Sequence, residues 1–321
     1  MKTGFEVLVG DCQEMLSMFI EDRYVQTCVT SPPYFGLRDY GHEGQIGLEE
    51  TPGEYVRKLV EVFREVKRVL KDDGTLWLNI GDSYAATTRN LGRNDAGRNF
   101  TGGGGNKEGS GNPGRQGSAR ANMSGLKPKD LIGIPWMLAF ALRADGWYLR
   151  QDIIWHKPNP MPESVRDRCT KAHEYVFLLS KSERYFFDAE AMKEPSAQPE
   201  RAGKLERSFS TGKPDAVLRQ DVGRAVMRTE TRNRRSVWTV ATRPYKGAHF
   251  ATFPPALIEP CILAGSRPGD IVLDPFGGSG TTAQVAAQHG RNALLCELNG
   301  DYVGLIHERM SKLCNMESEE V

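Results

Sequence analysis

Short apolar segments rich in β-branched residues alternate along this chain with segments of helical periodicity, and this alternation restricts the fold more than any other feature. The strand-like segments are seven: Phe5–Val9, Val25–Thr30, Thr75–Ile80, Gln151–Trp155, Glu174–Leu179, Ile271–Asp274 and Ala293–Glu297. Several are almost continuously apolar, as strands covered on both faces of a sheet are. Helical patterns occupy Pro52–Leu70, Leu131–Ala144, Phe253–Leu263 and Thr281–His289, the third interrupted by Pro260. The alternation predicts a mostly parallel α/β sheet with helices on both faces.

Charge is distributed unevenly, although the net charge of the chain is only +1. Residues 84–130 contain 8 Lys and Arg against 3 Asp and Glu, and residues 200–246 contain 12 against 5. The first segment also contains eleven glycines, which predicts a flexible insertion that either closes over a partner or is inert. Two basic segments on an acidic body favour a nucleic-acid ligand, although basic loops that bind nothing are also common.

These patterns divide the chain into five predicted regions. They are a first core half at 1–83, the insertion at 84–130, a continuation of the core at 131–194, a basic region at 195–246 and a second core half at 247–321. No apolar run is long enough to cross a bilayer, and the amino-terminal residues lack a signal-peptide pattern. The six cysteines are scattered, which predicts a reduced, cytoplasmic protein without a disulfide framework or a zinc site.

The stretch 269–299, GDIVLDPFGGSGTTAQVAAQHGRNALLCELN, contains the densest motif. A strand enters a glycine-rich turn, a helix follows, and Glu297 ends the next strand. Glycines let the backbone approach a ligand closely, and such an acid accepts hydrogen bonds from ribose hydroxyls. The spacing also fits the dinucleotide motif of nicotinamide and flavin enzymes, but those folds begin with this unit, whereas here it lies near the carboxyl end. No lysine follows the glycines, which argues against an ATP or GTP loop.

A second motif, Ser31-Pro32-Pro33-Tyr34, ends the segment Val25–Thr30. Proline corners commonly just terminate strands. Alternatively, a rigid corner with a hydroxyl and an aromatic ring holds a flat molecule by its edge and face.

Taken together, the motifs resemble the beta class of DNA amino-methyltransferases over nearly the whole chain. The matching segments, in the family's order, are GDC (10–12), TSPPY (30–34), LKDDGTLWLNIGDSY (70–84), IIWHKPNPMPESVRDRCTKAHEYVFLLSK (153–181), HFATFPPALIE (249–259) and DPFGGSGTT (274–282). The resemblance implies a circularly permuted, Rossmann-like sheet of seven strands. In that order Ile271–Asp274 lies beside Val25–Thr30, so the glycine turn and the proline corner share one cleft.

The resemblance also implies a reaction and a cofactor. These enzymes use S-adenosylmethionine to methylate an exocyclic amino nitrogen of a base turned out of double-stranded DNA. The Ser31 side chain and the Pro32 carbonyl would accept the two amino N–H bonds, Pro33 would help to fix the corner, and Tyr34 would stack on the base. A homodimer and a cognate restriction enzyme are further partners that the family suggests.

The remaining site residues follow from the same resemblance. Cofactor contacts are expected from Asp11 and Cys12 at the adenine, Glu297 at the ribose, Phe253 and Pro254 at the methionine end, and the turn residues Asp274, Phe276, Gly277, Gly278, Ser279, Gly280, Thr281 and Thr282. Asp11 equally suits a cap on the next helix, and Asp274 is favoured to hold the turn. His156, Lys157 and Asn159 are expected to line the base pocket. From its charge rather than from the resemblance, the basic region 195–246 is expected to be the DNA target-recognition region, with Arg232, Arg234 and Arg235 contacting a groove or phosphates. Trp155 and the pair His173-Glu174 are expected to be structural, and no metal site is expected.

Several alternatives remain open. In this family a serine before the two prolines usually accompanies cytosine N4, and an aspartate or asparagine accompanies adenine N6, so cytosine is favoured and adenine is the alternative. A nicotinamide oxidoreductase, a DNA-binding module without activity, and a methyltransferase for RNA or protein are more remote.

Overall fold

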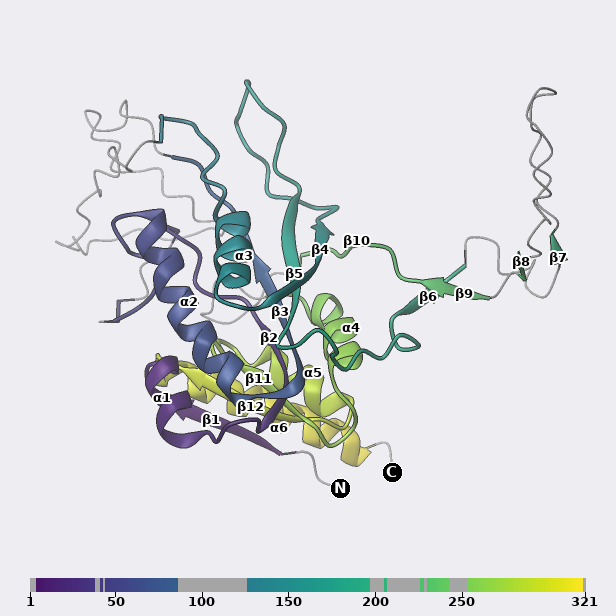
Figure 1. Cartoon of the computed structure of the whole chain (residues 1–321). Helices are drawn as coiled ribbons and strands as arrows, with labels where there is room; N and C mark the ends of the chain where they lie inside the picture. The colour runs from purple at the N-terminus through teal and green to yellow at the C-terminus, as the bar shows by residue number, and fades with distance from the viewer. Residues whose placement is uncertain are drawn as a thin grey trace.

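The computed structural model describes residues 4–37, 41–42, 44–85, 126–196, 205–206, 226–227, 230–242 and 253–319 (Figure 1). Most of the predicted insertion, residues 86–125, therefore lies outside the described residues, as does much of the predicted region 195–246. None of the helices in the described ranges is long and apolar enough to span a membrane.

One large sheet dominates the described part of the chain, and it contains eight strands. In spatial order they are β1 (Phe5–Val9), β12 (Asn292–Glu297), β11 (Ile271–Asp274), β2 (Val25–Thr30), β3 (Leu70–Ile80), β5 (His173–Ser180), β4 (Tyr148–His156) and β10 (Val237–Thr239). All the pairings are parallel except those of β5, which runs antiparallel to both of its neighbours. The order confirms a permuted sheet in which strands from the two ends of the chain lie side by side, β1 beside β12 and β2 beside β11.

All seven predicted strands are present, and the predicted adjacency of β11 and β2 is confirmed. These strands pair in parallel, with Val272 opposite Thr27 and Leu273 opposite Cys28. The short strand β10 was not predicted, because its β-branched and aromatic residues form only a short run next to several arginines. Pairing with β4 and burial of the Trp238 side chain, which is 5% exposed, hold β10 in the sheet.

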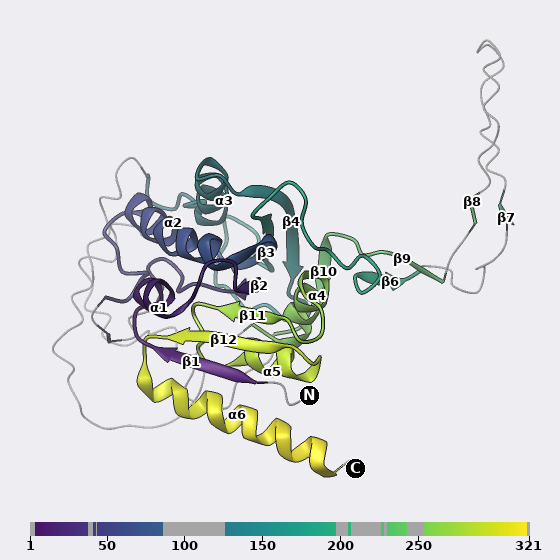
Figure 2. The ribbon, with the colours of Figure 1, turned by 60° about the horizontal axis from the view of Figure 1, so that its bottom comes forward.

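Helices cover both faces of the sheet (Figures 1 and 2). The first face carries α1 (Cys12–Phe19), α2 (Pro52–Val69) and α3 (Ile134–Ala144), and the second carries α4 (Pro255–Gly265), α5 (Thr281–Gln288) and α6 (Gly300–Glu319). Each set packs its own hydrophobic core against the sheet. The four predicted helices correspond to α2, α3, α4 and α5, and α4 continues through Pro260. No element was predicted for the residues of α6.

The helix α2 shows how local sequence sets an element. Thr51 caps its amino end by accepting a hydrogen bond from the Glu54 backbone N–H, and the Glu54 side chain returns the contact to the Thr51 N–H. This reciprocal capping box satisfies backbone donors that the helix would otherwise leave unpaired. The apolar residues, recurring at helical spacing, face the sheet.

A small extension leaves the core beyond β5 and returns at β10 (Figure 2). Its base is the antiparallel pair β6 (Lys193–Pro195) and β9 (Thr231–Asn233), and the pair β7 (Leu205–Glu206) and β8 (Val226–Met227) lies further out. The backbone N–H of Ser196 donates to the Glu230 carbonyl at 2.7 Å, which extends the β6–β9 pairing.

Candidate active site

The carboxyl ends of the parallel strands meet at one rim of the sheet, which is where open α/β sheets bind ligands. Asp11 follows β1, the proline corner follows β2, Gly81 follows β3, Lys157 follows β4, and the glycine turn follows β11. Because β5 is antiparallel, its first residues also lie at this rim. The fold therefore collects nearly all the predicted site residues of the core in one place.

Asp274 directly connects the two principal motifs. Its Oδ1 accepts hydrogen bonds from Thr30 Oγ1 at 2.6 Å and from the Phe276 N–H at 3.1 Å, and its Oδ2 accepts from Thr282 Oγ1 at 2.7 Å. Thr30 immediately precedes the proline corner, and Thr282 lies in the first turn of α5. The carboxyl is buried, and burial raises its pKa, although the three hydrogen bonds oppose that shift. The prediction that Asp274 holds the turn is confirmed.

The glycine turn is folded tightly against the end of β12. The Gly277 N–H donates to the Cys296 carbonyl at 2.8 Å, and a Cβ at Gly277 would lie 3.1 Å from Leu295 Cβ. Gly280 caps α5 with φ at 78°, in the left-handed region that favours glycine. The Ser279 hydroxyl is buried without a hydrogen-bond partner. Close backbone packing and an unsatisfied hydroxyl are features of a turn shaped for a ligand.

Glu297 lies under this turn. Its Oε2 accepts from the Gly278 N–H at 2.7 Å, and its Oε1 accepts from the Asn299 N–H at 2.9 Å. Burial raises the pKa of the carboxyl, and the two backbone hydrogen bonds partly offset that shift. The carboxylate thus lies at the end of β12, where a ribose acceptor is expected.

Asp11 caps α1, because its Oδ1 accepts hydrogen bonds from the Gln13 and Glu14 backbone N–H groups at 2.9 and 3.1 Å. The capping alternative from the sequence is therefore borne out, whereas an adenine contact stays a prediction. The neighbouring Cys12 side chain is buried in the core, and burial raises the pKa of its thiol.

Other predicted cofactor residues are placed as follows. Thr281 Oγ1 accepts a hydrogen bond from the Arg309 guanidinium on α6. Pro254 caps α4 and is buried, and Phe253 packs beside the core under that helix. The Thr281 side chain is thus joined to α6 and the Thr282 side chain to Asp274, and their contacts with a cofactor stay predictions.

The proline corner presents Tyr34 at the middle of the rim. The Pro33 carbonyl accepts a hydrogen bond from Tyr55 of α2 at 2.8 Å, which fixes the corner to the first helical layer. The Tyr34 hydroxyl donates to Glu174 Oε2 at 2.7 Å and approaches Asn79 Oδ1 at 3.3 Å. A Cβ at Gly81 would lie 2.7 Å from Tyr34 Cε2, so the tyrosine ring depends on the absence of a side chain there.

The three residues predicted for the base pocket have different surroundings. The Lys157 ammonium pairs with Glu174 Oε1 and lies 4.2 Å from the centre of the Trp155 ring. His156 Nδ1 is 3.1 Å from Thr239 Oγ1 of β10. The Asn159 amide exchanges two 3.0 Å hydrogen bonds with the backbone of Thr242. Asn159 therefore fastens the chain after β10, and Trp155 is a core residue, as predicted.

The three predicted DNA-contacting arginines lie around β9 and β10. Arg232 Nε and Arg235 Nε both contact Glu194 Oε1 at 2.9 Å. The Arg234 guanidinium lies 5.4 Å from the Trp238 ring, and its Nε is buried without a partner. Arg235 is the more exposed arginine of the Glu194 cluster, with a side chain 69% exposed, and it is thus the more accessible of the two to a ligand.

Sequence reasoning missed Asn79 and Gly81, and it assigned Glu174 a structural role only. Glu174 opens an apolar strand with no catalytic pattern around it. Its place beside Tyr34 results from the reversed direction of β5, which no local signal reveals. Within the described ranges, no three His, Cys, Asp or Glu side chains come together as a metal-ion site would require.

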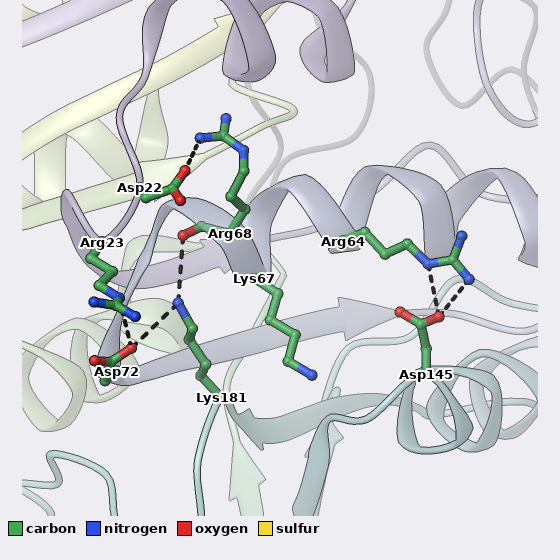
Figure 3. A pocket seen from close by; sticks show the side chains of 8 residues that line it. All are labelled: Asp22, Arg23, Arg64, Lys67, Arg68, Asp72, Asp145 and Lys181. Atoms are coloured by element: carbon green, nitrogen blue, oxygen red, sulfur yellow. Dashed lines mark hydrogen bonds and ion pairs between the residues drawn. The ribbon is translucent and has the colours of Figure 1, made fainter.

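A cavity of about 440 Å³ opens at the opposite rim, near the amino ends of the strands (Figure 3). Its charged lining is internally paired: Arg64 with Asp145 at 2.6 Å, Arg68 with Asp22 at 2.7 Å, and Arg23 with Asp72 at 3.1 Å. Lys67 and Lys181 cap backbone carbonyls of Gly146 and Leu70. We interpret the ion pairs that line this cavity as a structural network. They lie far from the rim that holds the motifs.

Comparisons with known proteins match this arrangement. The sequence model of a DNA methylase family covers residues 25–308. The type II methyltransferase M.SmaI of Serratia marcescens is 47% identical over 95% of this chain and 90% of its own length. The structure resembles PvuII DNA methyltransferase, described as cytosine-N4-specific, with a TM-score of 0.62 and 18% identity over 98% of this chain and 91% of that one. It also resembles a putative DNA modification methylase from Thermus thermophilus complexed with S-adenosyl-L-methionine, with a TM-score of 0.56 and 25% identity over 97% and 95% of the two chains.

Proposed function

We propose that this chain, which belongs to the N6/N4 DNA methylase family, methylates the N4 amino group of cytosine in double-stranded DNA. The observation that carries the proposal is the hydrogen-bonded connection Thr30–Asp274–Thr282, which joins the proline corner and the glycine turn at one rim. An amino acceptor and a methyl donor held by these motifs would lie side by side, and such proximity is a large part of catalysis.

S-adenosylmethionine, the cofactor of this family, supplies an activated methyl group on a sulfonium. The described residues fit an adenosyl ligand. The turn Phe276–Gly280 offers closely packed backbone and the unsatisfied Ser279 hydroxyl, and Glu297 offers a carboxylate for the ribose. Asp11 stands at the end of the adjacent strand β1. We assign these residues to cofactor binding, with Phe253 and Pro254 on the methionine side.

The proline corner activates the amino group. The lone pair of an exocyclic amine is delocalised into the ring, so the nitrogen is a weak nucleophile. Acceptance of its two N–H bonds by Ser31 Oγ and the Pro32 carbonyl draws the nitrogen towards tetrahedral geometry and makes the lone pair available. The ring of Tyr34 stacks on the base and holds it in line.

Cytosine is favoured because the residue before the two prolines is Ser31, the family's usual partner of N4. Adenine N6 is the alternative. The double-stranded DNA is recognised through the basic region 195–246, where Arg235 and Arg232 offer charge for phosphates. The homodimer, the cognate restriction enzyme and the cytoplasmic location remain predictions from the sequence.

The test is incubation of the purified protein with S-adenosylmethionine and unmethylated plasmid DNA, followed by mass spectrometry of the nucleosides. N4-methylcytosine is expected. N6-methyladenine alone would refute the choice of base, and no methylated nucleoside would refute the proposed function. A thermal shift with NAD and none with S-adenosylmethionine would instead favour a nicotinamide enzyme.

The variant Ser31→Ala separates chemistry from binding. We expect turnover to fall by about 100-fold, since an acceptor for the reacting amine is lost, while the Kd for S-adenosylmethionine stays within twofold. Ser17→Ala is the matched control, because the Ser17 hydroxyl contacts only the Glu14 carbonyl on α1 among the described contacts. Wild-type turnover in Ser31→Ala would contradict the assigned role.

A further inference from the structure

The reversed strand β5 brings an acid to the rim where the other strands end. Ile80, the last residue of β3, lies opposite Tyr175, and Trp155 of β4 lies opposite Glu174. Glu174 therefore stands between the ends of β3 and β4 and faces the corner that follows β2. The contact of its Oε2 with the Tyr34 hydroxyl at 2.7 Å joins residues 140 positions apart in the chain.

Tyr34 is held at its hydroxyl and along its ring. The hydroxyl contacts Glu174 and Asn79, and one ring edge lies against Gly81. Burial, and secondarily the charge of Glu174, raise the pKa of the Tyr34 phenol, so the hydroxyl remains a hydrogen-bond donor at neutral pH. Because its hydroxyl is held, the Tyr34 ring has little freedom to rotate before a base binds. Stacking on a mobile base therefore costs less conformational entropy.

Glu174 is fixed in turn by Lys157. The two side chains are 15% and 18% exposed, so the pair is largely removed from water. A carboxylate in such a place requires a partner of opposite charge. The Asn79 amide also approaches Glu174 Oε2 at 3.4 Å and donates to the Tyr175 carbonyl at 3.0 Å. The carboxylate thus has a defined orientation, one oxygen towards Lys157 and the other towards Tyr34.

We propose that Glu174 is a positioning residue that acts through Tyr34: it locks the ring in the plane on which the target base stacks, and Lys157 orients Glu174. This inference rests on the proposed function, because it assumes that a base is stacked on Tyr34. It also changes the role predicted for Lys157, from a base contact to a support of the carboxylate. The lock acts on the transfer step and leaves the glycine turn untouched.

A double-mutant cycle tests the lock. The measured quantity is the single-turnover rate of labelled methyl transfer from S-adenosylmethionine to unmethylated plasmid DNA, with enzyme and cofactor saturating. Tyr34→Phe keeps the ring and removes the tether, and Glu174→Ala removes the acceptor. Each change is expected to lower the rate by about tenfold, since misorientation of a reactant is costly. The double variant should be no more than twofold slower than Glu174→Ala, because both changes break the same contact.

Further measurements exclude a merely structural effect. The Kd for S-adenosylmethionine should remain within twofold in all variants, and Glu174→Gln, which keeps an acceptor oxygen, should recover part of the rate lost in Glu174→Ala. Two matched controls, Tyr185→Phe and Glu308→Gln, should keep the wild-type rate. In the wild type the Tyr185 hydroxyl accepts a hydrogen bond from Arg150, and Glu308 pairs with Lys312 on α6.

The outcomes separate the two proposals. If the wild-type protein transfers no label to DNA, the proposed function fails and this inference fails with it. If the wild type is active and Tyr34→Phe is equally fast, only the inference is overturned. A rate about 100-fold below wild type in the double variant, the product of two independent losses, would also overturn the inference. If Glu174→Ala fails to fold, Tyr34→Phe alone still tests it.

Discussion

Replacing Asp274 tests whether one buried carboxyl really unites the two halves of the site. In Asp274→Ala three hydrogen bonds are lost, and the hydroxyls of Thr30 and Thr282 lose their acceptor in the core. Hydrogen bonds to a charged group contribute about 1.5–3 kcal/mol each, and an unsatisfied buried hydroxyl costs about 1–3 kcal/mol. The variant also escapes the desolvation cost of the carboxylate, and Thr282 Oγ1 has the Val29 carbonyl at 3.4 Å as an alternative acceptor.

These opposing effects give an expected loss of about 3 kcal/mol in the free energy of unfolding for Asp274→Ala. Asp274→Asn retains an oxygen for Thr30 and the Phe276 N–H, and it should lose only about 1 kcal/mol. Urea unfolding followed by circular dichroism measures both values. Calorimetric titration should show weaker S-adenosylmethionine binding by at least tenfold in the alanine variant. An alanine variant that matches the asparagine variant in both assays would refute the bridging role.

Three further changes probe the rim. Gly81→Ala would place a Cβ 2.7 Å from Tyr34 Cε2, so methyl transfer to plasmid DNA should slow by about tenfold at unchanged cofactor Kd; an unchanged rate would show that the ring position does not matter. Gly280→Ala would hold an alanine in the left-handed region and place its Cβ 3.1 Å from the Ile306 side chain. It should lower the free energy of unfolding, measured in urea, by about 1–3 kcal/mol. Burial raises the pKa of Glu297. As the pH falls, the Glu297 carboxylate therefore becomes protonated at a higher pH than the carboxylate of an ordinary glutamate. Cofactor affinity measured by calorimetry should therefore weaken as pH falls through that raised value, and Glu297→Gln should lack this dependence.

The central architecture could be predicted from local signals together with the strand order that the family resemblance implies. The apolar runs of β11 and β2 and the glycines between β11 and α5 are visible in the sequence, and the family order makes those strands neighbours. The capping of α1 by Asp11 follows from residue type and position.

The features that escaped prediction depend on contacts between distant segments. Strand β10 (VWT) has β-branched and aromatic residues, but three residues beside a run of arginines are too short to establish a strand without the pairing with β4. The approach of Glu174 to Tyr34 depends on the direction of β5. Asn159 resembles a pocket residue beside His156 and Lys157, yet it ties down Thr242, 83 positions away. Such pairings are properties of the assembled sheet.

The attachment of β10 determines where this chain could exchange segments with a relative. Besides its pairing with β4, the segment is joined to that strand by Trp155 Nε1 donating to the Val240 carbonyl at 2.8 Å and by the Ile154 N–H donating to the Ser236 carbonyl at 2.8 Å. A graft cut within β10 would leave these partners exposed at the sheet edge. Junctions placed before Lys193 and after Thr242 would transplant β10 intact, so that its backbone could pair with β4 of the recipient. They are therefore the junctions at which the proposed DNA-recognition region 195–246 could be exchanged without breaking the edge of the sheet.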